Sequence, residues 1–356
     1  MLDGLHWSKA DAGYVASANF LGYFIGAVIA TRPIIPNHRR TWLLVSLLIS
    51  SITTAGMALD SRVLTLAVLR FVGGVTSAFV IVLASTLVLE RLSAAQRGHL
   101  SAVHFAGVGA GIMVSAAGVS VMVSVGAGWQ TLWIGSGAIS LIATSLVALL
   151  IGGQTEPTRA TATSGRTQPM NGLPFLVVAY GLFGFGYVIT ATFLVAIVRM
   201  TPEVRPLETW IWILFGFSAL PSVALWSWVG SRIGLLVTFM LACLAEAIGV
   251  AASVEWVTAF GIFISAVLLG GTFMGITAIG LMAARQLSGI NSQRGIGLMT
   301  ASFAVGQMIG PTVAGLLFDR LGSFRAPSLV AAVALVIAAA LASVTSKAAA
   351  QQKSVQ

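Results

Sequence analysis

Charged residues are scarce in this chain. Only 8% of its 356 residues are charged, whereas an average soluble domain has about 25%. The hydrophobic share of 57% and the mean hydropathy of +0.97 point the same way. This composition excludes an ordinary soluble domain and predicts a protein that crosses a membrane many times.

The sequence contains a single cysteine, Cys243, which lies in an apolar run. One cysteine forms neither an intramolecular disulfide nor a thiolate metal site. The sequence also lacks a His/Cys cluster at ligand spacing, a paired-carboxylate site and a Ser-His-Asp set at one membrane depth. We therefore expect no enzyme, no cofactor and no metal.

A basic patch is absent as well, although the net charge is +9. The Lys and Arg residues are spread over many loops instead of massed on one segment. Nucleic-acid binding needs a concentrated basic surface, so nucleic acid is excluded as a partner. The partner that the composition predicts is the lipid bilayer.

Apolar runs of about 20 residues, the length that crosses a bilayer, occur eleven times. We expect spans at 11–31, 41–59, 63–89, 98–127, 131–152, 172–198, 209–230, 235–253, 257–283, 295–317 and 326–345. The loops on one side carry twelve Lys and Arg, and those on the other side carry six. The richer side is therefore predicted to be cytoplasmic, together with the C-terminus.

Short sequence matches recur at nearly one offset. The pairs are Gln96-Arg97-Gly98 with Gln293-Arg294-Gly295, Gly73-Gly74 with Gly270-Gly271, and Phe105-Ala106 with Phe303-Ala304, at offsets of 197, 197 and 198. Equal orientation of the repeats predicts two parallel halves. We expect an N-terminal half-bundle at 1–152, a cytoplasmic linker at 153–171, a C-terminal half-bundle at 172–346 and a cytoplasmic tail at 347–356.

Several stretches resemble known transporters. Residues 66–78 (LAVLRFVGGVTSA) resemble the fourth-helix motif of the major facilitator superfamily, and residues 306–315 (GQMIGPTVAG) are similar to its eleventh-helix Gly-Pro motif. The stretches 104–109, 180–187 and 270–277 resemble the YbfB/YjiJ-type bacterial branch. The resemblance implies an all-α, two-half helical bundle in a bacterial inner membrane, usually monomeric.

That superfamily usually has twelve helices, so this chain shows eleven of them. Shifting the span 172–198 back by 197 residues puts its counterpart at about −25 to 1, before the chain begins. We therefore expect the first transmembrane helix to be missing, through either a late start codon or a truncation.

Arg70 is the most unusual residue inside a span. It lies seven residues past Val63, about 10 Å into the bilayer, where a guanidinium costs a few kcal/mol on insertion scales. The side chain either snorkels to the interface or serves a function. The resemblance implies a role in proton coupling, because the matching Arg of the fourth-helix motif is linked to it.

Five other polar residues inside spans are candidates for solute binding or coupling. They are His104, Asn19, Tyr180, Tyr187 and Gln307. The two tyrosines are seven residues apart and share a helix face, which suits a sugar or planar solute. Packing and hydrogen bonds between helices are the alternative for each of the five. Pro221 and Pro311 free backbone carbonyls within spans and predict bends.

Glycines at small-xxx-small spacing let helices approach closely. We expect Gly73, Gly74, Gly107, Gly111, Gly270, Gly271, Gly306 and Gly310 at helix interfaces. By the resemblance, the helices of the last six pack across the two halves, where the glycines would act as sliding surfaces. Ordinary tight packing is the alternative.

Together these features predict a secondary active transporter that moves a small organic solute by alternating access. The solute is expected to be neutral or anionic, sugar-like or organic-acid-like, with proton coupling. A transport-inactive truncated remnant or a membrane sensor is the alternative in another class. Drug or metabolite efflux by proton antiport is the alternative within the class.

Overall fold

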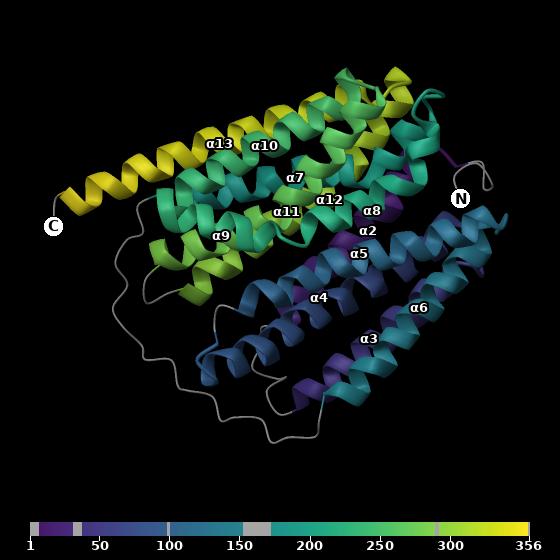
Figure 1. Ribbon diagram of the computed structural model, residues 1–356, viewed down its shortest axis with the longest axis horizontal. Helices are drawn as coiled ribbons and strands as arrows, with labels where there is room; N and C mark the ends of the chain where they lie inside the picture. Colours follow the sequence, from purple (N-terminus) through teal and green to yellow (C-terminus); the bar gives the residue numbers. More distant parts are fainter. Residues whose placement is uncertain (1–6, 31–37, 98–99, 152–171, 289–291, 355–356) are drawn as a thin grey trace.

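The computed structural model describes residues 7–30, 38–97, 100–151, 172–288 and 292–354, and these residues form a bundle of helices (Figure 1). The helices are α2 (Lys9–Ala30), α3 (Arg39–Gly56), α4 (Val63–Ala94), α5 (Ser101–Ser124), α6 (Trp129–Leu150), α7 (Leu173–Arg199), η3 (Arg205–Leu207), α8 (Glu208–Ala219), α9 (Ser222–Ile233), α10 (Leu235–Glu255), α11 (Ala259–Ser288), α12 (Ser292–Leu321) and α13 (Arg325–Ser354).

Each of the eleven predicted spans coincides with one of these helices or helix pairs. Nine described helices are long and apolar enough to cross a membrane, and the bent pair α8–α9 makes a tenth. The remaining predicted span is α3, which has 18 residues and carries Arg39 and Arg40 in its first turn. The prediction of an all-α polytopic membrane protein is confirmed.

Proline explains the bend in the seventh predicted span. The axes of α8 and α9 differ by 42°, and the break lies at Leu220 and Pro221. Pro221 has no backbone N–H to donate, and its ring clashes with the preceding turn. Pro311, by contrast, lies inside the continuous helix α12.

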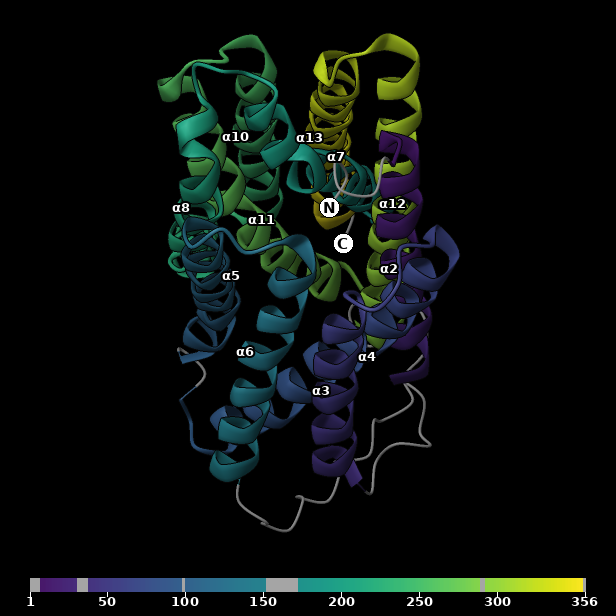
Figure 2. The ribbon, with the colours of Figure 1, turned by 90° about the vertical axis from the view of Figure 1, so that its right-hand side faces the viewer.

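The helices form two groups that lie side by side (Figures 1 and 2). In the first half, α4 packs against α2 and α3, and α3 packs against α6. In the second half, α10 packs against α11 and α13, and α7 packs against α12 and α13. The two halves meet where α2 packs against α12 and α5 against α8.

The boundaries of the predicted domains stay a prediction, because residues 152–171 lie outside the described residues. α13 continues to Ser354, so the segment expected as a tail begins as an extension of this helix. For reference, we call the end of the bundle with the α3–α4 turn the Asp60 end. The opposite end, with the α9–α10 turn, is the Arg232 end.

The second half is the more tightly packed of the two. Its core holds the fully buried side chains of Leu176, Phe183, Phe239, Leu269 and Ile276. In the most apolar window of α11, 61% of residues are buried, whereas the figure for α5 is 6%. The second half is therefore the scaffold on which a precise site is more readily built.

Candidate functional site

α7 carries three aromatic rings on one face. The ring centroids of Tyr180 and Phe183 lie 5.7 Å apart, and those of Phe183 and Tyr187 lie 5.8 Å apart. Residues three, four and seven positions apart share a face of a helix, so the three rings follow from their spacing. Tyr180 and Phe183 are fully buried, whereas Tyr187 is only half-buried. Tyr187 is thus the ring that a ligand can reach.

Tyr187 stacks on rings from two neighbouring helices. Its plane lies within 9° of both Phe273 on α11 and Phe303 on α12, at centroid distances of 5.4 and 6.2 Å. The side chain of Gln307, one turn after Phe303, is buried and lies in hydrogen-bonding reach of the Tyr187 hydroxyl. We call Tyr187, Phe273, Phe303 and Gln307 the aromatic site.

Pro311 adds a backbone acceptor beside Gln307. In a regular helix the carbonyl of Gln307 would accept the N–H of residue 311, but proline has none. Gln307 therefore offers a side-chain amide, with donors and an acceptor, and a carbonyl that cannot accept the usual helix bond from residue 311. Apolar ring faces with a few polar groups are typical of small-molecule sites.

The first half faces this site through α2. Tyr23 lies within electrostatic range of both Tyr180 and Tyr187. Asn19, one turn earlier on the same helix, is half-buried, and within the described ranges no residue hydrogen-bonds to its side chain. α2 thus brings the Tyr23 phenol within electrostatic range of the two α7 tyrosines.

Near the Asp60 end, α2 is fastened to α12. The Asp319 carboxylate accepts hydrogen bonds from the backbone N–H groups of Lys9 and Ala10, at 3.1 and 3.0 Å. These N–H groups belong to the first turn of α2, where a carboxylate also complements the helix dipole. The hydroxyls of Ser17 and Thr312 lie 2.7 Å apart. We call the contacts of Asp319 and Thr312 with α2 the α2–α12 latch.

Arg70 lies within the first half, away from the aromatic site. Its guanidinium carbon is 5.1 Å from the centroid of the Trp133 ring on α6, which is a cation–π contact. Trp133 itself packs beside Leu66 in a small apolar cluster. The predicted coupling residue therefore has a packing partner.

His104 ties α5 to α4. Its Nε2 lies 3.1 Å from the Ser85 hydroxyl oxygen, and its ring meets Phe105 edge-on at 5.1 Å. Ser85 is 15 residues beyond Arg70 on α4, about 22 Å along the helix. The structure therefore does not bring the two predicted coupling residues, Arg70 and His104, together.

Tyr180 does not line a solute path in this structure, because only 1% of it is exposed. Its hydroxyl donates to the Thr277 carbonyl at 3.3 Å, and its ring packs between Phe239 and Phe303. Tyr180 thus lies in the core of the second half, and its contact with solute stays a prediction.

The predicted interface glycines do allow close packing, but mostly within one half. Gly73 and Gly74 lie against α3 and α2, Gly270 and Gly271 against α8, and Gly306 and Gly310 against α7. Gly107 and Gly111 are exposed, and a side chain added at either would meet nothing within 4 Å. The expectation that the last six of the eight line the contact between halves is therefore corrected.

Other glycines form that contact. Gly13 of α2 lies against the Pro311 carbonyl, and Gly315 of α12 against the backbone of Lys9. Gly109 of α5 and Gly216 of α8 lie against each other's helices. An added Cβ at any of the four would come within about 2.7 Å or less of backbone atoms, so these are the positions where the halves require glycine.

Sequence reasoning did not select Tyr23, Phe273 or Phe303 as functional residues. Phe303 carried one signal, because it is the repeat partner of Phe105. Phe273 falls in the stretch 270–277 that carries the family resemblance, but nothing in that stretch marks its ring as functional. Tyr23 sits in an apolar span where nothing in the pattern separates it from ordinary core residues. Within the described ranges, no group of three His, Cys, Asp or Glu side chains could hold a metal ion.

A family model described as "Uncharacterised MFS-type transporter YbfB" matches residues 1–343. The chain belongs to this family of the major facilitator superfamily. It is therefore a transporter and not an enzyme, and it is a multi-pass membrane protein. Among curated proteins, none matches the chain significantly.

Two solved structures share the fold. A point-mutant form of the nucleoside transporter NupG superposes with a TM-score of 0.70 at 16% sequence identity, covering 97% of this chain and 93% of NupG. Another structure of NupG gives a TM-score of 0.66 at 14% identity, covering 98% and 93%. At this identity the likeness concerns the fold alone.

Proposed function

We propose that this protein is a proton-coupled secondary transporter that moves a small, neutral, ring-bearing solute across the bacterial inner membrane by alternating access. The observation that carries this proposal is the stack of Tyr187 with Phe273 and Phe303 beside Gln307. This group of side chains lies where α7, α11 and α12 face Tyr23 of the first half. Nucleosides are the first solutes to test.

A neutral solute fits the aromatic site better than an anion. Its four side chains are uncharged, and Arg70 lies over Trp133 in the first half. An anion in the site would lose its water without gaining a cation, which is costly in a low-dielectric interior. A nucleoside has a planar base that can stack on aromatic rings and hydroxyls that can bond to the Gln307 amide. The structural likeness to a nucleoside transporter supports this choice.

Alternating access is supported by the way the halves meet. The α2–α12 latch joins them near the Asp60 end, and Gly13, Gly109, Gly216 and Gly315 let the backbones of facing helices approach closely where the halves meet. The counts of Lys and Arg support an orientation with the Asp60 end outside and the C-terminus in the cytoplasm. One chain supplies both faces of the site, so the monomer is the functional unit.

The solute class is tested by uptake into proteoliposomes of purified protein. We expect saturable uptake of labelled uridine, competition by other nucleosides, and no uptake of lactate, the organic-anion probe. Uptake of glucose is measured in the same way as the probe for a sugar-like solute. Saturable lactate uptake without uridine uptake would contradict the neutral-solute assignment.

The same experiment separates the alternatives. Uridine binding without flux would favour a sensor or an inactive remnant. With an acidic interior, which reverses the pH gradient, protons leaving the vesicle would drive uridine accumulation if the protein were a proton antiporter. We expect instead that an acidic exterior drives uridine accumulation.

A further inference from the structure

Glu246 is a carboxylic acid in the middle of the second half. It lies on α10, nine residues before Glu255, and thus about 14 Å from the Asp60 end of the helix. Its exposed fraction is 0%, and neither carboxyl oxygen has a hydrogen-bond partner in the described part of the chain. An ionisable residue buried within a span is a functional candidate by default, because it is costly to keep there.

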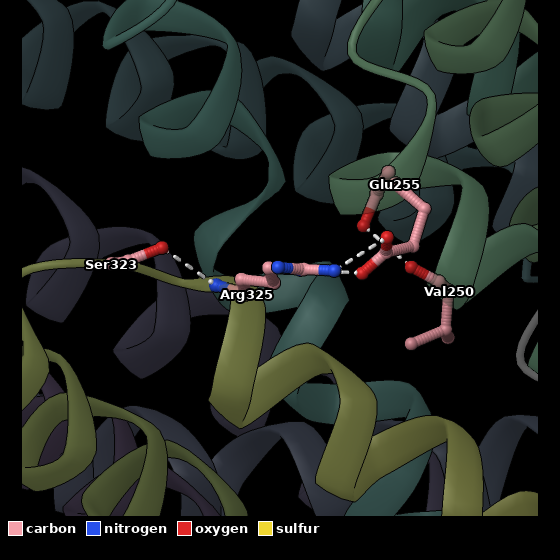
Figure 3. Close-up of polar contacts among 5 residues, drawn as sticks. Val250, Glu255, Ser323 and Arg325 are labelled. Carbon is pink, nitrogen blue, oxygen red and sulfur yellow. Dashed lines mark hydrogen bonds and ion pairs between the residues drawn. The ribbon is translucent and has the colours of Figure 1, made fainter.

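Glu255, on the same helix, shows how this chain satisfies a carboxylate elsewhere. Two guanidinium nitrogens of Arg325 contact its oxygens at 2.7 and 3.0 Å, at the surface where α10 ends and α13 begins (Figure 3). Glu246 has no such partner among the described residues. A buried charge without a partner is so unfavourable that the group neutralises itself, so in this conformation the Glu246 carboxyl holds its proton.

The surroundings of Glu246 connect it to the aromatic site. α7, α9, α11 and α13 all pack against α10. From α7, Tyr187 lies within electrostatic range of Glu246, and Cys243 does so from one turn earlier on α10. From α11 the neighbour is Thr272, whose hydroxyl already donates to the Leu268 carbonyl at 2.6 Å.

The cationic groups on the helices that pack against α10 all lie near helix ends, away from this depth: Arg199, Arg232, Arg285, Arg325 and Lys347 in the part of the chain that the structure describes. No described cation therefore offsets a charge on Glu246. The titratable groups that face it are the Tyr187 phenol and the Cys243 thiol.

Buried polar atoms without partners extend from Glu246 toward the Asp60 end. The hydroxyls of Thr190 on α7, Ser265 on α11 and Ser328 on α13 are all buried and unpaired within the described ranges. Thr190 is nine residues from the Asp60 end of α7, Ser265 six from that of α11, and Ser328 three from that of α13. Such groups are usually satisfied by internal water, which could carry a proton along this side of α10.

We propose that Glu246 is the proton-binding residue that couples proton movement to solute transport at the aromatic site. This inference rests on the proposed function. The proton passes from water on one side to a Glu246 carboxyl oxygen and leaves to water on the other side as the halves rock. No bond of the solute forms or breaks.

The test compares two fluxes in proteoliposomes of purified protein, with labelled uridine as the probe. Equilibrium exchange of uridine needs no net proton transfer, whereas accumulation driven by an acidic exterior does. Glu246→Gln keeps the shape of a protonated carboxyl. We expect it to retain exchange within about twofold of wild type, while gradient-driven accumulation and uridine-induced proton influx fall at least tenfold. Glu255→Gln, on the same helix, is the matched control and should retain both.

Glu246→Gln with undiminished gradient-driven accumulation would overturn the proposal. If that variant fails to fold, Glu246→Asp is used instead, because it keeps a carboxyl. We expect it to retain gradient-driven uridine accumulation with a shifted dependence on pH. An unshifted pH dependence of accumulation would count against the proposal. Wild type without uridine exchange would contradict the proposed solute instead. In that case, the infrared band of a protonated carboxylic acid tests whether Glu246 holds a proton. The band should be present at neutral pH in wild type and absent in Glu246→Gln. Its absence in wild type would overturn the proposal.

Discussion

At the scale of single residues, side chains of the same type differ in burial and in their contacts, and therefore in their roles. Tyr180 and Tyr187 lie on one face of α7, but Tyr180 is packed in the core and Tyr187 is partly accessible. Arg70 and Arg325 likewise differ, because Arg325 pairs with a carboxylate and Arg70 lies over an indole ring. The partner of each residue, more than its type, indicates what the residue does.

The Arg70–Trp133 contact is expected to stabilise the first half. A cation–π contact contributes about 0.5 to 2 kcal/mol, so Arg70→Gln and Trp133→Leu should be non-additive by that amount in a double-mutant cycle. The free energy of unfolding is measured in detergent by denaturant titration. Arg62→Gln with Trp133→Leu is the control and should be additive, because Arg62 is exposed in the α3–α4 turn.

One result would support the role in proton coupling that the sequence predicts for Arg70. If Arg70→Lys keeps the unfolding free energy of wild type but abolishes proton-driven uridine uptake, Arg70 acts in coupling and not only in packing. We expect that substitution to leave uptake within about twofold of wild type, since a lysine retains the cation over Trp133.

At the scale of elements, the α2–α12 latch is the contact that must break when the Asp60 end opens. Asp319→Ala removes the acceptor for two N–H groups of α2 and should therefore favour opening at that end. Spin labels at Arg62→Cys and Arg205→Cys, one in each half, should report a larger population at long distance in this variant. Cys243→Ser provides the cysteine-free background.

Asp11→Ala is the matched control for the latch. Asp11 lies at the same end of α2, but among the described residues its carboxylate accepts hydrogen bonds only from Ser8. We expect its distance distribution to match that of wild type. Equal distributions for Asp319→Ala and wild type would show that the latch does not hold the Asp60 end closed.

The start of α4 should show a pH dependence. A side-chain hydrogen bond from Thr65, and then the backbone N–H groups of Arg62 and Ser61, hold the pKa of Asp60 below its usual value. A lowered pKa in the folded state stabilises the fold above the unfolded pKa of about 3.9, and this contribution is lost as pH falls through the folded value.

Asp60→Ala should therefore lower the melting temperature in detergent at pH 7, and the difference from wild type should shrink as the pH is taken below about 4. Thr65→Val should act in the same direction with a smaller effect. A difference that stays constant down to pH 3 would show that the carboxylate charge is not what stabilises the turn.

The positions of the helices could be predicted from the sequence, whereas the contents of the site could not. Hydrophobic run length fixes a span almost by itself, and Pro221 marked the break between α8 and α9. Packing across helices leaves no such local signal. The glycines at the contact between halves are Gly13, Gly109, Gly216 and Gly315, and their spacing does not distinguish them from the glycines that pack within one half.

At the scale of the whole molecule, the two halves differ although their sequences repeat. The second half holds the large aromatic core, the aromatic site and the buried Glu246, whereas the first half contributes α2 and its side of the α2–α12 latch. In the proposed transport cycle the second half provides a preformed surface for the solute. The first half would move against it and supply Asn19 and Tyr23 when the halves close.

Uridine counterflow in proteoliposomes tests this account most directly. Vesicles preloaded with unlabelled uridine should transiently concentrate labelled uridine, because an alternating-access carrier exchanges solute across one site. Loss of the stacked ring in Tyr187→Ala should slow this exchange roughly tenfold or more, equivalent to about 1.4 kcal/mol, while Tyr14→Ala, at an exposed ring on α2, should leave it unchanged. Counterflow that is equally fast in Tyr187→Ala and wild type would contradict the placement of the solute site.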